Sequence, residues 1–188
     1  WFEVEPGTRL LGQWHRQERR TGAPMLLLVH GLEGSSRSHY MRGTAEKAWR
    51  AGFQVVRLNQ RSCGGTEAET PTLYHSGMSR DIGRVVEILE AEGVGPISIA
   101  GFSMGGNLVL KLAGERGAEL PRKVAAVVAV SPALDLGATA RALEAPWNRL
   151  YQWHFLRSLK QRLRRKARLF PERYDPAALA RIRTLREF

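Results

Sequence analysis

Short apolar runs alternate along the chain with longer stretches in which apolar residues recur every three or four positions. A strand buried on both faces of a sheet is continuously apolar, whereas an amphipathic helix repeats with a period near 3.6. On this basis we expect strands at residues 2–4, 10–15, 25–29, 54–58, 97–100 and 124–130, and helices at residues 39–51, 77–92 and 106–116. Strands alternating with helices are typical of βαβ units. The sequence therefore predicts an α/β fold with a mostly parallel sheet of about six strands.

The pattern changes after the predicted strand at residues 124–130. Its continuous apolar character indicates a fully buried strand, and Ser131 and Pro132 end it. No further strand is expected. Residues 147–170 have a mostly helical pattern, and residues 176–185 predict another short helix. We therefore expect two parts: an incomplete core over residues 1–145 and a helical cap or lid over residues 146–188, which leads to missing C-terminal strands.

The positive charge is concentrated in the predicted cap. The chain has a net charge of +11, and residues 145–188 hold 12 of its 29 Lys and Arg residues but only 3 of its 18 Asp and Glu residues. One apolar stripe runs through this basic stretch, made of Phe155, Leu159, Leu163, Ala167 and Phe170. A basic amphipathic helix suits a lid with weak contact to an anionic membrane surface through residues 155–170. A solvated helix face is the alternative. No recognition motif accompanies the charge, so we expect no nucleic-acid partner.

The strongest candidate for chemistry is Ser103, in the segment Gly-Phe-Ser-Met-Gly at residues 101–105. The segment lies between a predicted strand and a predicted helix, which is the context that the G-x-S-x-G motif requires. A strand that reverses sharply into a helix brings the residues two before and two after the serine together. Only very small side chains fit there, and Gly101 and Gly105 occupy both positions. The sequence predicts Ser103 as a catalytic nucleophile.

Acyl transfer at Ser103 also needs at least two N–H donors aimed at the developing oxyanion. One is expected from Met104, the residue after the nucleophile, and the other from the loop that follows residues 25–29. That loop reads His-Gly-Leu-Glu-Gly at residues 30–34. We assign the second donor to Leu32, because Gly31 beside it lets the backbone approach the site. His30 precedes the nucleophile at a strand end, so we interpret it as structural.

Several blocks in order along the chain resemble the YheT-like hydrolases, the fourth family of α/β-hydrolase-domain proteins. They are His-Gly-Leu-Glu-Gly at 30–34, Arg-Ser-Cys-Gly-Gly at 61–65, Tyr-His-Ser-Gly at 74–77, Gly-Phe-Ser-Met-Gly-Gly-Asn at 101–107, Ser-Pro at 131–132 with Asp-Leu at 135–136, and Arg-Thr-Leu-Arg-Glu-Phe at 183–188. The family usually has glycine where this chain has Ser62. The resemblance implies longer proteins, truncation of this chain at both ends, and a triad aspartate and histidine beyond residue 188.

Residues within the chain are weaker candidates for the other two members of a triad, whose order in this fold is Ser, Asp or Glu, then His. His154 lies in the helical excursion, and Asp135 comes one strand too early and suits a helix cap. Asp175 before Pro176 also reads as a cap. His39 and His75 either open helices, which we favour, or line the pocket. Cys63 suits a packed thiol better than a reactive one.

The favoured hypothesis is a serine hydrolase of carboxylic esters, of short or medium acyl chain or lipid type, that forms an acyl-enzyme on Ser103. The small-molecule ester is the expected partner, with no metal and no organic cofactor. An alcohol acyltransferase using the same site remains open, as does a non-catalytic module that binds a ligand or a membrane surface. The 188 residues alone are expected to be inactive. The single cysteine fits a reducing compartment, so we expect a cytoplasmic protein that contacts membranes at most.

Overall fold

The computed structural model describes residues 1–17 and 22–188. They form two compact units, Trp1–Pro132 and Ala133–Phe188, which we describe separately. The sequence places the division at residues 145/146, thirteen residues further along the chain, where the predicted core gives way to the predicted cap.

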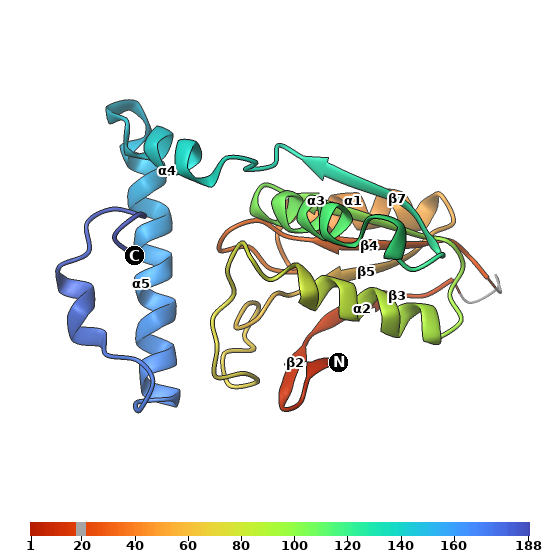
Figure 1. The fold of residues 1–188 in the computed structure, drawn as a ribbon, viewed down its shortest axis with the longest axis horizontal. Helices are drawn as coiled ribbons and strands as arrows, with labels where there is room; N and C mark the ends of the chain where they lie inside the picture. The colour runs from red at the N-terminus through yellow and green to blue at the C-terminus, as the bar shows by residue number, and fades with distance from the viewer. Residues whose placement is uncertain (18–21) are drawn as a thin grey trace. The chain divides into compact units, whose positions relative to one another are not determined.

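The first unit is built on a five-stranded sheet (Figure 1). In spatial order its strands are β3 (Gly12–His15), β5 (Gln54–Leu58), β4 (Met25–Val29), β6 (Ile97–Phe102) and β7 (Val124–Val130). Only β3 runs antiparallel to its neighbour, and the other pairs are parallel. A mostly parallel sheet with flanking helices is the predicted α/β fold.

The expected strand at residues 10–15 is in fact two strands. β1 (Phe2–Glu5) pairs with β2 (Thr8–Leu10) as a hairpin across the turn at Gly7, whose φ is +75°. The chain then passes Leu11 and enters the main sheet as β3. The prediction of a single long strand is therefore wrong, because the chain changes partners in the middle of it.

Helices cover both faces of the sheet, and alternate strand residues face them. α2 (Ser79–Ala91) and α3 (Met104–Arg116) pack on the face that carries Leu27 and Val29. α1 (His39–Arg50) packs on the face that carries Leu28. Each of these three strand side chains is fully buried, as a strand covered on both faces requires. A short 3-10 turn, η1 (Gly117–Glu119), leads from α3 towards β7.

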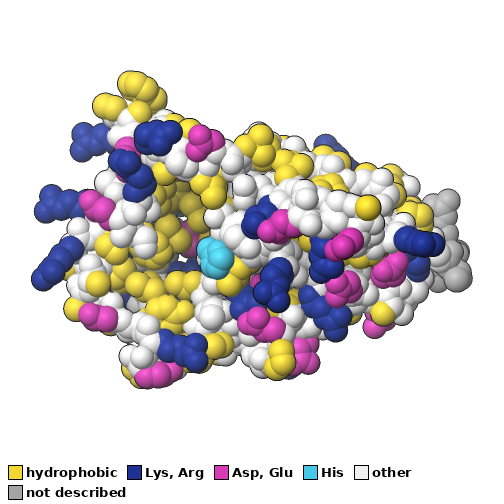
Figure 2. All heavy atoms as spheres, viewed as in Figure 1, with side chains coloured by type: hydrophobic (Ala, Val, Ile, Leu, Met, Phe, Trp, Pro, Cys, Tyr) yellow, Lys and Arg dark blue, Asp and Glu magenta, His cyan; other side chains and the backbone are white. Residues whose placement is uncertain are grey.

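The outer face of the first unit carries charges of both signs. Over α2, blue and magenta side chains are interspersed in Figure 2. Arg84 and Arg116 both pair with Glu87 there, at 3.2 Å. Exposed pairs of this kind stabilise by less than about 1 kcal/mol each. Because charges of both signs are mixed here, this surface is not a patch of one charge.

Burial of β7 differs from the expectation. Val128 and Val130 are 49% and 43% exposed, although the strand lies where the apolar run predicts it. In the described residues β7 is an edge strand that pairs only with β6. The prediction of a fully buried strand was therefore wrong. An apolar run shows that the strand favours burial, but not that another element packs against it.

The second unit is helical. It contains α4 (Leu136–Glu144), η2 (Pro146–Asn148), α5 (Arg149–Leu169) and η3 (Pro176–Ala180). Asp135 and Asp175 cap α4 and η3 as expected, each accepting a backbone hydrogen bond of 2.8 Å. The last element is a 3-10 turn that ends five residues before the predicted helix does. Hydrophobic side chains gather at the end where α4 leads into α5 (Figure 2). Within residues 1–17 and 22–188, no helix combines the length and apolar character that crossing a membrane requires.

Candidate active site

The turn between β6 and α3 consists of Ser103 alone, because the strand runs to Phe102 and the helix begins at Met104. Ser103 has φ 52° and ψ −117°, a conformation that L-residues rarely adopt. Its N–H donates to the Val130 carbonyl at 2.9 Å, and its carbonyl accepts from Asn107 N–H at 3.0 Å. The backbone of the serine is therefore held between β7 and the first turn of α3.

Two glycines make this turn sterically possible. A Cβ added at Gly101 would lie 2.2 Å from the Gly105 carbonyl oxygen, and one added at Gly105 would lie 2.4 Å from the His30 carbonyl oxygen. Both neighbours are backbone atoms, which cannot swing away as a side chain does. These close backbone contacts agree with the expectation that only glycine fits at both positions.

The Ser103 side chain is exposed and lies beside the loop after β4. A Cβ added at Gly31 would be 3.1 Å from Ser103 Cβ and 3.7 Å from Ser103 Oγ. In the part of the chain that the structure describes, the Ser103 hydroxyl has no hydrogen-bond partner. It is thus presented at the end of the sheet and at the N-terminus of α3, where developing negative charge is favoured.

Two tyrosines hold the loop at residues 30–34. Tyr40 Oη, from the first turn of α1, accepts a hydrogen bond of 3.1 Å from Gly31 N–H. Tyr74 Oη accepts one of 2.7 Å from Glu33 N–H and donates one of 2.9 Å to Glu33 Oε1. Glu33 has φ 56°, and both tyrosines fix the loop on either side of Leu32.

Leu32 and Met104, the two expected oxyanion donors, meet in one apolar cluster with Tyr74 and Cys63. Neither backbone N–H takes part in a hydrogen bond among the described residues. Met104 opens α3, so its N–H is one of those that a helix leaves unpaired. Cys63 is fully buried in this cluster, in agreement with its interpretation as a packed thiol.

His30 is buried and oriented by its neighbours. Its Nδ1 lies 2.8 Å from the Gly31 carbonyl, and its Nε2 accepts from Gln60 N–H at 3.1 Å. Both ring nitrogens therefore face the backbone, which supports the structural interpretation. Gln60 further donates from its side chain to the His30 carbonyl at 2.7 Å, so the end of β4 is fastened to the loop after β5.

Three further histidines named in the sequence analysis lie at helix starts or on α5. His75 Nδ1 accepts from Gly77 N–H at 3.1 Å, just before α2. His39 is the exposed first residue of α1, with its ring edge-on to Tyr40 at 5.4 Å. His154 is exposed on α5, in the second unit, against the Phe155 ring. The roles at helix starts that the sequence favours for His39 and His75 agree with these positions.

A comparison with models of protein families matches residues 24–181 to the one described as alpha/beta hydrolase fold. The chain belongs to the α/β-hydrolase fold family. Among curated relatives of this family, it is 35% identical to the “Putative esterase YheT” of Escherichia coli over 168 residues, 88% of this chain and 49% of that protein. This likeness confirms the resemblance to the YheT-like hydrolases.

Two further comparisons are consistent with the family. The chain is 29% identical to Phospholipase ABHD3 of Mus musculus over 167 residues, 88% of this chain and 40% of that protein. It thus spans about half or less of these curated relatives. A solved structure of Est1E from Butyrivibrio proteoclasticus with ferulic acid matches 71% of this chain and 53% of its own, with a TM-score of 0.57 and 22% identity. At that identity the match shows the fold alone.

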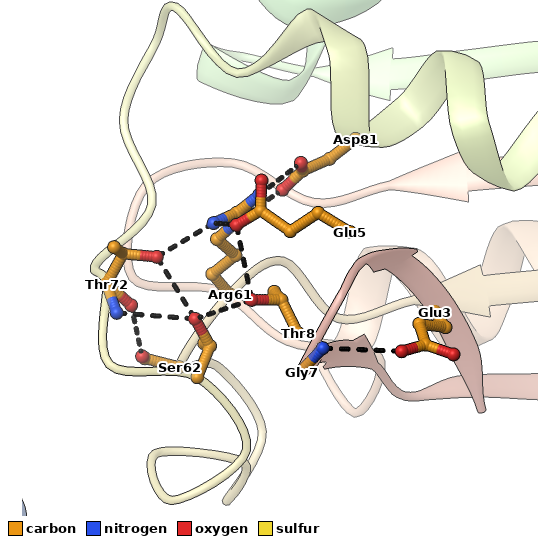
Figure 3. A network of polar contacts seen from close by, with 9 residues as sticks. Glu3, Glu5, Gly7, Thr8, Arg61, Ser62, Thr72 and Asp81 are labelled. Carbon is orange, nitrogen blue, oxygen red and sulfur yellow. Dashed lines mark hydrogen bonds and ion pairs between the residues drawn. The ribbon is translucent and has the colours of Figure 1, made fainter.

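A buried ion-pair network in the first unit, which the sequence analysis does not predict, is centred on Arg61 (Figure 3). Arg61, after β5, is 5% exposed and contacts both oxygens of Asp81 at 2.6 and 2.7 Å. Its Nη1 also donates to Glu5 at 2.6 Å and to Thr72 at 2.8 Å. The network joins the β1–β2 hairpin, the loop after β5 and the first turn of α2.

The charges of this network reinforce one another. Hydrogen bonds to Asp81, followed by those to Glu5, raise the pKa of Arg61 above its ordinary value. The hydrogen bond from Arg61 is the main cause that lowers the pKa of Glu5. The sequence signal for the network was Arg61 itself, which opens one of the family blocks. Nothing local pointed to Asp81 as its partner.

Ser62 is the position at which this chain departs from the usual family glycine. Its φ is 58°, in the left-handed region that glycine adopts without strain. The Ser62 hydroxyl donates to the Thr72 carbonyl at 3.0 Å, as Figure 3 shows, so the serine gains a contact in return for an unfavourable backbone conformation. Among residues 1–17 and 22–188, no group of three His, Cys, Asp or Glu side chains is arranged as metal ligands.

Proposed function

We propose that the protein is a serine hydrolase that cleaves carboxylic esters through an acyl-enzyme on Ser103. The observation that carries the proposal is the turn itself: an exposed serine at φ 52°, at the first turn of α3 and beside Gly31. Such strain persists only where the surrounding structure imposes it, and it is concentrated at functional sites. The family membership gives this geometry its chemical interpretation.

In the proposed reaction, Ser103 Oγ attacks the ester carbonyl carbon and its proton passes to a general base. The carbonyl oxygen becomes an oxyanion, which accepts hydrogen bonds from the N–H groups of Leu32 and Met104. The carbon–oxygen bond to the alcohol then breaks, and the base returns the proton to the departing alkoxide. Water attacks the acyl-enzyme in the same manner, which releases the acid and restores the Ser103 hydroxyl.

We propose that a histidine and an aspartate outside residues 1–188 act as the base and its partner, as the family resemblance implies. His30 is unsuited to the role because both of its ring nitrogens face backbone groups. An isolated serine is a weak nucleophile, so the proposed activity belongs to the full-length protein. The acyl-enzyme also accounts for the open alternative of acyl transfer, in which an alcohol replaces water in the second step.

The proposed substrate class is a small-molecule ester of a short- or medium-chain acid, or of a lipid acid. The relatives named as an esterase and as a phospholipase support acyl esters in general. The preferred acyl chain length is measured by comparing hydrolysis rates over a series of p-nitrophenyl esters from acetate to octanoate. Hydrolysis in the presence of ethanol, with the ethyl ester measured, separates hydrolase from acyltransferase.

A fluorophosphonate probe, which attaches covalently to activated serines, tests the nucleophile in the full-length protein. We expect labelling of the wild type and none of Ser103→Ala, with ester hydrolysis reduced by at least about 10⁴-fold. Ser131→Ala is the matched control, because Ser131 is also an exposed serine at positive φ (47°) after a parallel strand. It should label normally. A folded full-length protein that does not label would favour the non-catalytic binding module.

Tyr74→Phe tests the oxyanion loop. The change removes the acceptor for Glu33 N–H, next to Leu32, and leaves the ring in its apolar cluster. We expect Tyr74 to be a positioning residue, so kcat should fall roughly tenfold while KM changes little, as expected when an interaction that strengthens in the transition state is weakened. A change confined to KM or to stability would contradict this role.

We also propose a cytoplasmic location with weak contact to anionic membrane surfaces through residues 155–170. One buried cysteine fits a reducing compartment. On α5, Arg157, Arg164 and Arg168 are exposed, and no acidic residue lies between residues 145 and 171. Sedimentation with vesicles should show binding to phosphatidylserine-containing membranes that salt abolishes, and none to neutral ones. Equal binding to both would refute the electrostatic contact.

A further inference from the structure

A cavity of about 490 Å³ lies in the first unit between the edge strand β3, its neighbour β5 and helix α1. The strands contribute His15 and Arg57, and α1 contributes His39, Arg42, Glu46 and Trp49. None of these residues belongs to the proposed hydrolytic machinery at Ser103. The cavity therefore has no role in the reaction described above, and its lining carries chemistry of its own.

Arg57 is the unusual member of this lining, because a strand position with 7% exposure is a costly place for a charge. Its Nη1 donates to the Ser36 carbonyl, and its Nη2 lies 2.8 Å from Gln13 Oε1 and 3.0 Å from His15 Nε2. All three partners are neutral acceptors or a neutral imidazole. Among the described residues no carboxylate pairs with Arg57, in contrast to Arg61 with its two.

Arg57 also has an unused donor. Its Nε is buried and has no hydrogen-bond partner within the described chain. An unpaired N–H of a buried cation is rare, because such a group loses its hydration without compensation. Arg57 therefore brings to the cavity lining a positive charge that no carboxylate among the described residues balances.

The rest of the lining strengthens the positive character. Arg42 and His39 on α1 line the cavity and are exposed. The single carboxylate, Glu46, is engaged by Arg50 one turn further along the helix, at 2.5 Å. Burial and the nearby Arg42 both lower the pKa of Arg57, so the two cations repel each other when nothing lies between them. An anion between them removes that repulsion.

The size of the cavity indicates an anion with an organic body. A bare oxyanion occupies a small part of 490 Å³, and the lining includes Trp49, which is anchored by a 3.1 Å hydrogen bond from its Nε1 to the Arg16 carbonyl. Cβ atoms at Gly43 would meet nothing within 4 Å, so α1 leaves the cavity open there. Two guanidiniums and two imidazoles suit the several acceptor oxygens and the double charge of a phosphate monoester.

We propose that the cavity between β3, β5 and α1 is a binding site for a phosphate monoester, with its phosphate on Arg57 and Arg42 and its organic group towards Trp49. This is a second site on the protein, separate from Ser103. Because it makes no use of the nucleophile, binding persists in Ser103→Ala.

Calorimetric titration of the full-length protein with inorganic phosphate and with phenyl phosphate, at constant ionic strength, tests the site. We expect saturable binding of both, with phenyl phosphate at least about threefold tighter because its ring reaches Trp49. Arg42→Ala, at an exposed position, should weaken both ligands roughly tenfold by removing one charge-assisted contact. Phosphate that binds more tightly than its phenyl ester would overturn the place assigned to the organic body.

Lys47→Ala is the matched control, since it removes one positive charge from the same helix outside the cavity lining. It should change both affinities by less than about twofold, as expected for a screened surface charge. Equal weakening by Lys47→Ala and Arg42→Ala would reduce the effect to general electrostatics and overturn the site. Absence of saturable binding in the wild-type protein would overturn it outright.

Discussion

The two units of the chain treat their apolar side chains in opposite ways. In the first unit, neighbouring strand residues such as Leu27 and Leu28 are both fully buried, one under each helical layer. In the second unit, Trp147 and Leu150 are 82% and 81% exposed. The first unit is therefore specified by its interior. The helices of the second are specified by local signals, such as the caps at Asp135 and Asp175 and long runs of good helix formers.

If the first unit depends on close backbone packing, Gly101→Ala should have the largest effect. The added methyl group would meet the Gly105 carbonyl at 2.2 Å, and neither backbone can move without disturbing the turn. We expect a loss of more than about 4 kcal/mol in the free energy of unfolding, or no folded protein. Urea denaturation of the full-length protein measures this.

Gly114→Ala is the matched control for this change. Gly114 lies in α3, the helix that follows the turn, and a Cβ there would meet nothing within 4 Å. Alanine should stabilise the helix by about 0.5–1 kcal/mol. If the two alanine variants had similar stabilities, close packing at the turn would not be what holds it.

The buried ion pair should give the next largest effect. Asp81→Ala leaves the Arg61 guanidinium buried without its bidentate partner, which should cost about 3 kcal/mol. Arg50→Ala breaks an exposed pair with Glu46 and should cost less than about 1 kcal/mol. Denaturation midpoints of both variants, compared with the wild type, decide the matter. A loss below 1 kcal/mol in Asp81→Ala would mean that Glu5 and Thr72 suffice to hold Arg61.

His15 should make the first unit sensitive to mild acid. Burial, and then the charge of Arg57 from the neighbouring strand, lower the pKa of His15 below its ordinary 6.5. The unfolded chain therefore takes up this proton first as the pH falls. The stability contributed by neutral His15 is complete above pH 6.5 and is lost as the pH falls through the lower, folded pKa.

Thermal melts between pH 8 and pH 5 measure this dependence. The decrease in melting temperature should be smaller in His15→Gln, which cannot take up the proton. Identical pH profiles for wild type and His15→Gln would show that groups other than His15 govern the decrease.

The smallest effect is expected in the second unit. Leu150→Ala removes a side chain that is 81% exposed, so the free energy of unfolding should change by no more than about 0.5 kcal/mol. The same substitution at Leu108, which is 1% exposed in α3, should cost about 2–5 kcal/mol. A large loss from Leu150→Ala would show that this side chain is buried in the full-length protein, and would remove the contrast between the units.

The sequence predicts the bounds of a strand best where the local pattern of residues alone determines them. β4, β5 and β7 begin and end at the expected residues, because each is a short segment rich in Val or Leu. It fails where a neighbour decides the outcome. The change of partners at Leu11 has no local signal, and the exposure of Val128 depends on what covers β7 and not on its own side chain.

The candidate site divides in the same manner. Ser103, Gly101 and Gly105 lie within one short segment, so their spacing alone describes the turn. Tyr40 and Tyr74 were missed, because they reach the loop at residues 30–34 from the chain before and after β5, and no spacing rule links them to it. The place of Arg57 in the cavity lining was missed, because nothing in the sequence around this strand residue indicates the cavity beside it.

The placement of Ser103 has a consequence for redesign. Its location is determined by main-chain contacts, those at Gly101 and Gly105 and the hydrogen bond to Val130, and none of them involves the serine hydroxyl. The identity of the side-chain atom at this position is therefore independent of the contacts that fix the position. A cysteine in its place would present sulfur at the same point and in the same direction, so the element at this position can be exchanged without rebuilding the turn.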